Sequence, residues 1–567
     1  MSRPAVCEGD RRGRGTVAKQ PANNLAIMAR RRGLLLPIAV GVSCINCGFA
    51  FAPAHQSTSH QRTTRRTTRS ALSAVKVKTS SPSKSSSRLS RTSAFTDWAK
   101  ENNIKYAGVE VSSGGDNSGL GLYVTQDINA NDVLIQVPTN MVIQAESPDY
   151  NTVMEREVFD SNPKAYRNLQ WWAALSVQLN YYDKINPVND KAGGISIQPW
   201  LNSLPRVYDT PAFNWAESSL EELQYRPMIE AVALQKRAWK KEFETVQKAA
   251  SKDFLSKVSF EDFVWGCETA RSRAFSGAYS GSAFNPIPYA TVTVLVAVYV
   301  ALGIGSIEQA ANGAALVICG SILKDFVVPK LLKIQKYVIC PLIDMANHVG
   351  TGAAGNVSFE YFADGYSLSA LSNAKKGSEM FISYGPRSND QLLQYYGFVE
   401  EQNAHDIYIL PPIREWDIGQ LEEACGRKIG NGRLEKLDRV GLLGKAAANS
   451  ENPDAANDIG GVVLTRASGI DPAVTQALRA LISTDSEWQD SGESIGNFAE
   501  MVSAENEQAA RTVARRAMEL ELESKPTTIE EDVNLLKVMQ DKDGVDLAVK
   551  FRLEKKKLLQ EAISRMR

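Results

Sequence analysis

An apolar run that stops at a cluster of polar residues places the strongest constraint on how this chain can fold. The segment YVICPLIDMANHVG, residues 337–350, reads as a short buried strand followed at once by Asp344, Asn347 and His348. Such polar groups next to a core are usually hydrogen-bonded, because burying them unpaired is costly. Together with the short alternating segments up to residue 399, the pattern predicts short strands and turns around a polar centre.

Length and charge limit the classes of protein that fit. The chain has 567 residues, which exceeds one hydrophobic core, so two or three domains are expected. Its 64 basic residues balance its 64 acidic residues, so it has no overall attraction to nucleic acid, and we expect no nucleic-acid partner. Its seven cysteines and four histidines lack zinc-ligand spacing outside Cys44 and Cys47, so we expect no metal site.

Residues 1–96 have the composition of a targeting sequence. Arg30 to Arg32 precede an apolar stretch, as in a secretory signal. Residues 51–96 then contain nine Lys or Arg, no Asp or Glu, and many Ser and Thr, which is typical of a transit peptide. The order resembles the bipartite presequence of algae with secondary plastids, with cleavage expected at Ala50-Phe51. We predict a disordered presequence and a plastid stromal location; the alternative is a disordered basic tail.

Hydrophobic periodicity predicts the elements that follow. We expect a short amphipathic helix at 95–104, two or three strands with a turn within 119–143, helices over 154–260, short strands and turns over 337–399, and helices from about 413 onward. The last helices have charged faces, as in VKFRLEKKKLLQEAISRMR, residues 549–567.

One apolar segment is unusual for a soluble enzyme. Residues 287–307 contain no charged residue across 21 positions, and residues 309–323 are apolar again. The first piece is long enough to cross a bilayer core, and the small residues of the second suit close helix packing in lipid. Two alternatives stay open: membrane contact through 287–323, or a helical hairpin buried against the globular core.

Four short motifs carry the chemistry in their order along the chain. They are GLGL at 119–122, SRAF at 272–275, DMANH at 344–348 and FISYGPRSNDQLLQYYGFV at 381–399. Each alone has an ordinary structural explanation, such as a turn or a buried polar pair. In this order and spacing they resemble the SET-domain methyltransferases, and in particular the branch of the Rubisco large-subunit lysine methyltransferase.

The resemblance implies the fold class and the domain boundaries. We expect an α+β SET domain over 97–400, built of short strands with a knotted C-terminal part. A helical insert occupies about 154–260, and the apolar segment, about 284–336, is an insertion without a counterpart in the plant enzyme. An all-α substrate-binding domain would follow at 401–567.

The resemblance also implies S-adenosylmethionine as the cofactor. Gly119 and Gly121 lack a Cβ, so their backbone can approach a ligand closely. Arg273 suits the carboxylate end of the cofactor, because a guanidinium can hold a carboxylate with two hydrogen bonds. The full set of expected cofactor contacts is Leu120, Gly121, Ser272, Arg273, Asp344, Asn347, His348 and Phe398.

Tyr384 is the expected catalytic residue. Its hydroxyl would orient the substrate amine in a narrow channel whose walls are Phe275, Ile382 and Tyr396. An apolar channel also lowers the pKa of a lysine by desolvation, which raises its reactive neutral fraction. Two positions depart from the family pattern. The spacing from Tyr384 to Tyr396 is one residue shorter than expected, which concerns the loop between them, and Ser118 stands where an acid is expected, which concerns the cofactor contacts near it.

The sequence therefore predicts an S-adenosylmethionine-dependent protein-lysine N-methyltransferase that acts on a plastid protein. Rubisco large subunit and aldolase are substrates expected from the family alone. Two alternatives are kept: a protein-histidine methyltransferase, since a relative of this branch modifies actin, and a membrane-associated, non-catalytic binding module with the SET fold.

Overall fold

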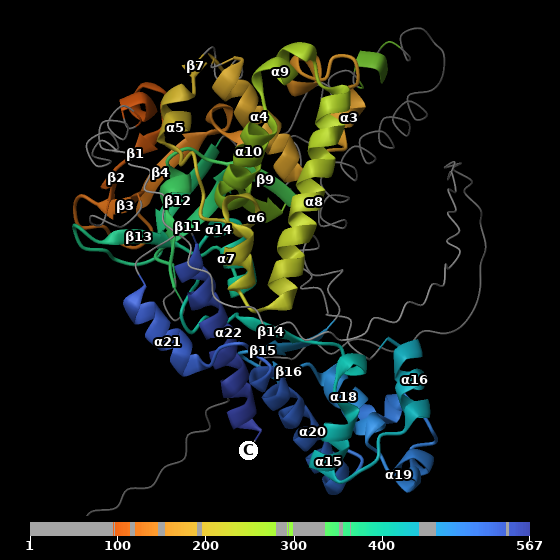
Figure 1. The fold of residues 1–567 in the computed structure, drawn as a ribbon. Helices are drawn as coiled ribbons and strands as arrows, with labels where there is room; N and C mark the ends of the chain where they lie inside the picture. Colours follow the sequence, from red (N-terminus) through yellow and green to blue (C-terminus); the bar gives the residue numbers. More distant parts are fainter. Residues whose placement is uncertain are drawn as a thin grey trace, which may run out of the picture. The chain divides into compact units, whose positions relative to one another are not determined.

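The computed structural model describes most of the chain after residue 94 (Figure 1). The described residues are 95, 97–113, 120–145, 153–186, 188–189, 195–278, 335–350, 355–362, 365–441, 461–539 and 544–566, with five more between 292 and 298. The predicted presequence and nearly all of the apolar insertion fall outside these residues, so both stay predictions.

The first described helix covers one edge of the core. Residues 97–101 are helical, as the amphipathic pattern predicts. Phe95 and Trp98 are buried and their rings stack at 5.8 Å between centroids. Their spacing of three puts both rings on one helix face, which seats the helix on the core.

Two four-stranded sheets of short strands follow. The first has the order β1–β4–β12–β11, and the second has the order β10–β13–β3–β2. The first sheet comprises β1 (Lys105–Tyr106), β4 (Val133–Pro138), β11 (Val357–Phe362) and β12 (Gly365–Ala370), and the second comprises β2 (Val109–Ser113), β3 (Leu120–Val124), β10 (Asn347–His348) and β13 (Glu379–Ile382). The strands predicted within 119–143 are confirmed, because β3 and β4 lie there and Asn131, with φ +70°, turns the chain between them.

Helices interrupt the strands between β5 and β8, as predicted for the insert. They are α2 (Val153–Glu157), α3 (Pro163–Arg167), α4 (Trp171–Lys184), α5 (Gln198–Ser203), α6 (Pro211–Asn214), α7 (Glu217–Glu221), α8 (Arg226–Ala249), α9 (Lys252–Lys257) and α10 (Phe260–Arg273). Two short strands, β6 (Val188–Asn189) and β7 (Ile195–Ser196), pair within this region. Figure 1 shows the long α8 running beside α4 and α10.

Helix α10 matters most, because it ends in the predicted SRAF motif. A capping box of Ser259 and Asp262 fixes its first turn. It packs closely on α4: a Cβ at Gly266 would lie 2.4 Å from Ser176 Oγ, and that hydroxyl donates to the carbonyl of Phe263 at 2.7 Å. The close packing sets the direction in which the last turn delivers Arg273.

A third sheet carries the chain from α10 to the DMANH motif. It has the order β5–β9–β8, with β5 (Ile143–Gln144), β8 (Phe275–Ala278) and β9 (Gln335–Ile339). After β9, Leu342 adopts φ +73°, a 3-10 turn spans Ile343–Met345, and β10 begins at Asn347. The apolar run of the sequence is thus the buried β9, and the polar cluster is the turn that leads from it to the second sheet.

The C-terminal domain is helical, as predicted, and includes one small sheet. Its helices are α15 (Ile418–Cys425), α16 (Asn431–Arg439), α18 (Pro472–Leu481), α19 (Asp485–Asp490), α20 (Ala504–Glu523), α21 (Ile529–Val538) and α22 (Val545–Arg565), and it also has the 3-10 turns Ile413–Glu415 and Ile495–Ala499. Helix α14 (Asn389–Tyr396) and the 3-10 turn Thr139–Met141 come before this domain. The sheet is formed by β14 (Ile407–Leu410), β15 (Val462–Thr465) and β16 (Gly469–Ile470). The prediction of helix throughout from residue 413 is corrected by β15 and β16.

The charged stretch of α22 is buried, whereas its composition predicts an exposed face. Arg552, Glu554, Lys555 and Lys556 are each about 2% exposed or less. Each lies against an opposite charge or a backbone carbonyl, which compensates the loss of water. The predicted charged face of this helix is therefore buried in ion pairs.

Across the described ranges, the structure has no helix with both the length and the apolarity that a bilayer crossing needs. Three described residues of the predicted membrane segment, Val294, Leu295 and Val298, are 61%, 61% and 47% exposed. At these positions the globular core does not cover the side chains.

Candidate functional site

The second sheet brings three of the four motifs together. Strand β13 lies between β10 and β3. β10 and β13 pair in parallel, with His348 opposite Ile382. Asn347 on the same strand donates through Nδ2 to the carbonyl of Leu120 at 3.2 Å and lies against Gly121. Motifs that are more than 200 residues apart along the chain therefore meet on one sheet.

The amide of Asn347 ties these segments to one another. Its Nδ2 also donates to Glu379 Oε1 at 2.7 Å, and the other oxygen of that carboxylate accepts from the hydroxyl of Tyr123 at 2.9 Å. The amide of Asn347 thus holds these segments together and is also a candidate cofactor contact. Glu379 was not predicted from the sequence, since its partner lies 32 residues away and no local pattern links them.

Gly121 allows this close approach. A Cβ at this position would lie 2.2 Å from Glu379 Oε1 and 2.9 Å from Asn347 Nδ2, closer than real Cβ contacts. Any side chain here would displace the carboxylate or the amide. The neighbouring Gly119 and Ser118 lie outside the described residues, so their predicted roles stay predictions.

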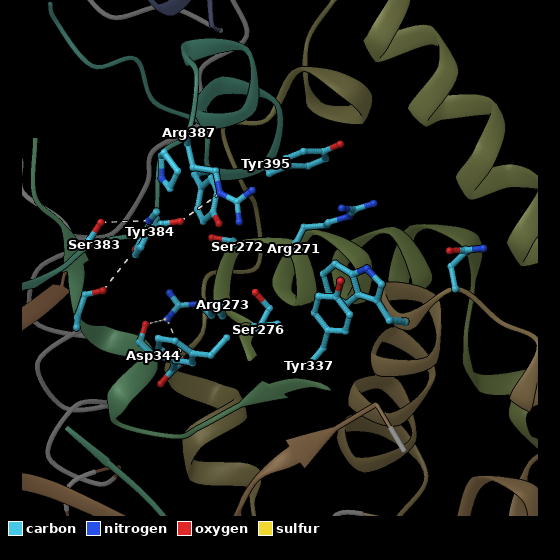
Figure 2. Close-up of a pocket in the computed structure, with 18 residues that line it drawn as sticks. Arg271, Ser272, Arg273, Ser276, Tyr337, Asp344, Ser383, Tyr384, Arg387 and Tyr395 are labelled. Carbon is cyan, nitrogen blue, oxygen red and sulfur yellow. Dashed lines mark hydrogen bonds and ion pairs between the residues drawn. The ribbon is translucent and has the colours of Figure 1, made fainter. Parts of the chain in front are cut away.

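The fourth motif, SRAF, is joined to DMANH by an ion pair at the end of α10. Arg273 Nη1 donates to Asp344 Oδ2 at 3.1 Å and to the backbone carbonyl of Asp344 at 2.9 Å (Figure 2). Trp200 Nε1 faces the same carboxylate at 3.4 Å. Burial opposes the charge of Arg273, but the attraction of Asp344 and the contact with Tyr208 outweigh it, so the pKa of Arg273 is raised. The guanidinium therefore keeps its charge inside the site.

Tyr384 lies at the centre of the assembled residues. Its backbone N–H donates to His348 Nδ1 at 3.1 Å, and its hydroxyl donates to the carbonyl of Ala346 at 3.3 Å. Its ring stacks on those of His348 and Tyr396, with centroids 4.9 Å and 4.7 Å apart. Burial, together with Tyr396, raises the pKa of the Tyr384 phenol. The hydroxyl therefore stays protonated and can orient a ligand without ionising.

A pocket of about 580 Å³ opens beside Tyr384 (Figure 2). Six of the predicted site residues line it: Ser272, Arg273, Phe275, Asp344, Tyr384 and Tyr396. The remaining predicted residues lie behind it on the sheet or beside it: Leu120, Gly121, Asn347, His348, Ile382 and Phe398. Phe398 approaches both His348 and Tyr396, with ring centroids 6.0 Å and 6.3 Å away.

The outer part of the pocket is aromatic and cationic, which the sequence did not indicate. Trp171 and Tyr337 stack in parallel, with centroids 3.9 Å apart. The guanidinium of Arg271 lies 4.9 Å from the ring of Trp171 and 4.6 Å from that of Tyr395. Arg387 donates through Nε to the carbonyl of Tyr384 at 3.1 Å. Arg271 directly precedes the SRAF motif and Arg387 lies within the motif at 381–399, but neither was predicted as a site residue.

Strands β8 and β9 both contribute to the pocket wall. Phe275 and Ser276 lie on β8, and Tyr337 lies on β9. Phe275 is fixed by stacking on Phe359, with ring centroids 4.3 Å apart. The segment that contains the apolar insertion leaves β8 after Ala278 and returns at Gln335, each two residues along the strand from a residue that lines the pocket.

Comparison with known proteins identifies the C-terminal domain. Residues 437–559 match the family model described as Rubisco LSMT substrate-binding. Most of the described C-terminal helices fall within this match.

Two kinds of curated relative match most of the chain. The actin-histidine N-methyltransferase of Danio rerio is 23% identical over 82% of this chain, and the human protein of the same name is also 23% identical. The chain covers 66% of the length of these relatives, just under two thirds. A chloroplastic lysine N-methyltransferase of fructose-bisphosphate aldolase from Arabidopsis thaliana is 23% identical over 78% of this chain and 76% of its own length.

Solved structures match the fold. The SET domain of LSMT bound to lysine and AdoHcy aligns over 84% of this chain and 91% of that chain, with a TM-score of 0.54 and 20% identity. Rubisco LSMT bound to AdoMet aligns over the same shares with a TM-score of 0.53 and 20% identity. The likeness confirms the predicted fold class.

Proposed function

Because this chain joins the SET-domain fold of Rubisco LSMT to the substrate-binding domain of that family, we propose that it is an S-adenosylmethionine-dependent protein-lysine N-methyltransferase. One observation carries the proposal. Three of the four ordered motifs line one pocket beside a protonated tyrosine and an aromatic wall, and the remaining motif, GLGL, is hydrogen-bonded to DMANH through Asn347. Methyl transfer to an amine needs mainly positioning and charge stabilisation, which such a site supplies.

The residues present fit the cofactor. At Gly121 the space that a Cβ would fill is occupied by Glu379 and Asn347, so the glycine lets β3 pack closely against the DMANH segment that would hold the cofactor. Arg273 lines the pocket, and its buried Nε has no hydrogen-bond partner among the described residues, which leaves a cationic donor for a carboxylate. When bound, S-adenosylmethionine supplies a methyl group activated by its sulfonium. The residues that would hold it are Leu120, Gly121, Ser272, Arg273, Asp344, Asn347, His348 and Phe398.

Tyr384 orients the substrate amine. Its hydroxyl hydrogen is directed to the carbonyl of Ala346, so its oxygen lone pairs can accept a hydrogen bond from the amine N–H. Its backbone is anchored by His348 and its ring stacks on those of His348 and Tyr396. The group that positions the amine is therefore itself held rigidly, as catalysis by orientation requires.

The channel favours a neutral amine. Phe275 and Tyr396 are aromatic walls, and Ile382 is buried on the strand behind them. Desolvation and the nearby charge of Arg273 both oppose an ammonium ion, so they lower the pKa of an entering lysine. A proton therefore leaves the amine before transfer, and no ionised base is needed among the pocket residues.

The substrate class follows from the domain match and from the relatives. A substrate-binding domain suits a protein substrate, and the chloroplastic aldolase methyltransferase among the relatives supports a plastid protein. Rubisco large subunit and aldolase are the first proteins to test. The proposed plastid location and the membrane contact through 287–323 rest on the sequence alone.

A protein-histidine methyltransferase is the second candidate, because several of the relatives methylate actin histidine. Phe275 argues against it. An imidazole needs a hydrogen bond that leaves the correct ring nitrogen free to react, and a phenyl ring fixed on Phe359 supplies none. The third candidate, a non-catalytic membrane-associated module, is favoured only by the apolar segment.

A methyl-transfer assay tests these candidates. The full chain, in mild detergent, is incubated with methyl-labelled S-adenosylmethionine and either Rubisco, aldolase or a plastid stromal extract. We expect one labelled protein whose label maps to a lysine. Tyr384→Phe should lower kcat by about a hundredfold, because the ring stays in place while the orienting oxygen is lost.

The control is a variant outside the site, Lys375→Ala, whose side chain is 85% exposed in a surface ion pair. It should match the wild type. Label on histidine would replace the lysine proposal with the second candidate. Cofactor binding without label in any fraction, membranes included, would favour the non-catalytic module.

A further inference from the structure

Glu400 lies behind the catalytic centre and is not among the predicted site residues. It follows Phe398 by two positions, and its Oε2 is 3.6 Å from His348 Nε2. The side chains of Glu400 and His348 are each about 10% exposed. A nearly buried carboxylate therefore lies near Nε2 of the imidazole, whereas the backbone N–H of Tyr384 contacts Nδ1.

The geometry fixes where His348 carries its hydrogen. Tyr384 donates its backbone N–H to His348 Nδ1 at 3.1 Å, so Nδ1 must present a lone pair. The hydrogen of the neutral ring is therefore on Nε2, the nitrogen that faces Glu400. A negative carboxylate favours this tautomer over the one with the hydrogen on Nδ1, which could not accept from Tyr384.

The imidazole also supports the tyrosine ring. His348 and Tyr384 stack at 4.9 Å with planes 22° apart, and Tyr384 stacks in turn on Tyr396. A change in the tautomer or tilt of His348 would therefore remove a backbone hydrogen bond and a stacking partner of Tyr384 together. Both effects move the hydroxyl that orients the amine.

The backbone of Glu400 is fixed independently of its carboxylate. Asn389 accepts from the Glu400 N–H at 3.0 Å and donates to the Glu400 carbonyl at 2.9 Å. The carboxylate oxygen Oε1 is buried and meets no hydrogen-bond donor within the described ranges. The carboxylate of Glu400 is therefore placed to interact with the imidazole of His348.

We propose that Glu400 is a positioning residue for the catalytic tyrosine, which acts by holding His348 in the tautomer that accepts the backbone N–H of Tyr384. The catalytic part of this inference rests on the proposed methyl transfer. The structural part of the inference concerns the tautomer of His348, and it does not depend on methyl transfer.

Two variants of the full chain separate the role of the acceptor from the role of the side-chain volume. Glu400→Gln keeps a carbonyl oxygen that can face Nε2–H, and Glu400→Leu has similar size but no acceptor. We expect Glu400→Leu to lower kcat about tenfold while KM for the protein substrate changes less than threefold. Glu400→Gln should retain kcat to within about threefold. Equal losses in both variants, or none in Glu400→Leu, would overturn the proposal.

A spectroscopic measurement tests the structural part without turnover. The chain has four histidines, so the ¹⁵N-imidazole NMR spectrum is simple, and His348→Asn identifies the His348 signals. We expect the wild type and Glu400→Gln to show the Nε2–H tautomer and Glu400→Leu to show a mixture. A wild-type Nδ1–H tautomer would refute the inference even where a variant fails to fold. Absence of methyl transfer with the expected tautomer would contradict the proposed function and leave the structural inference standing.

Discussion

At the scale of single residues, the site depends on a tyrosine that stays neutral. Burial and Tyr396 raise the pKa of Tyr384, and the contacts of its hydroxyl, backbone and ring all hold it in one place. In the proposed reaction the role of Tyr384 is therefore to orient the amine, and the proton lost before methyl transfer would come from that substrate amine. The ionisation of the amine would then set the pH dependence of the proposed reaction.

We expect kcat to rise with pH by about tenfold per pH unit until the pKa of the bound lysine is reached, because only the neutral amine reacts. Tyr384→Phe should be slower at every pH and keep the same slope. Initial rates from about pH 6.5 to about pH 9.5 measure both profiles. A fall at alkaline pH in the wild type that is lost in Tyr384→Phe would show that the phenol ionises.

The ordered motifs predict residues that line the pocket. They do not predict the residues that hold those side chains in place. Arg273, Phe275 and Tyr384 line the pocket where the motifs place them. Glu379 and Glu400 act through partners 32 and 52 residues away on other strands, and such pairing leaves no local pattern in the sequence. Their carboxylates are indistinguishable from surface acids until the sheet register is known.

At the scale of the element, α10 connects the helical insert with the site. Its residue Glu268 is 4% exposed and accepts at one oxygen from Thr210 Oγ1 and Asn214 Nδ2, both at 2.6 Å. Burial raises the pKa of Glu268 from 4.5 to about 7, although the two donors oppose the rise. The helix that delivers Arg273 is thus tied to α6 and its N-cap residue by a group that titrates near neutral pH.

The pH dependence of stability follows from this shift. Glu268 binds its proton more tightly in the folded chain, so its contribution to the free energy of unfolding is present at low pH and lost as pH rises through about 7. Glu268→Gln removes this loss and keeps an acceptor for both donors. At pH about 8 it should be more stable than the wild type by about 1–3 kcal/mol, and near pH about 5 the advantage should vanish.

Denaturant unfolding at the two pH values measures the difference. Glu261→Gln on the same helix is the matched control, because Glu261 is exposed and should show no such dependence. A Glu268→Gln variant that is less stable than the wild type at both pH values would mean that the hydrogen bonds to the charged form outweigh burial.

The elements themselves differ in how far the sequence predicts them. Helices of ten or more residues, such as α8 and α20, have a clear apolar stripe. Strands β15 and β16 have four and two residues and lie between helices, so their pattern is too short to resolve. The partner strand β14 lies more than 50 residues earlier, and only the folded chain brings them together.

At the scale of the whole chain, α22 is bound to the segment that forms the channel wall. Lys555 donates to Asp406 Oδ1 and to the carbonyl of Ile407, both at 2.7 Å, and also pairs with Asp390 at the start of α14. Asp406 in turn accepts from both nitrogens of Asn389, the residue that fixes Glu400. A buried lysine of the C-terminal domain thus holds the turn that carries the site.

Lys555→Met should destabilise the protein by about 3–5 kcal/mol, because it leaves two buried carboxylates without their cation. Burial opposes the charge of Lys555, yet Asp390 and Asp406 raise its pKa, so the wild-type lysine is charged. The midpoint of denaturant unfolding measures the loss, which should shrink at low pH as the carboxylates take up protons. Lys550→Met on the same helix is the control, since Lys550 is half exposed. Equal stability of the two variants would contradict this role.

The position of Lys555 also determines when the site can form. Asp390 and Lys555 are 165 residues apart in the chain. A ribosome adds about 5–20 residues per second, so the turn with Asp390 emerges on the order of ten seconds before its lysine. During that interval the channel wall lacks the cation that fixes it. The candidate site is therefore completed late in the synthesis of the chain, and a premature stop codon between the codons for Asp390 and Lys555 would leave the SET fold with an unfinished pocket.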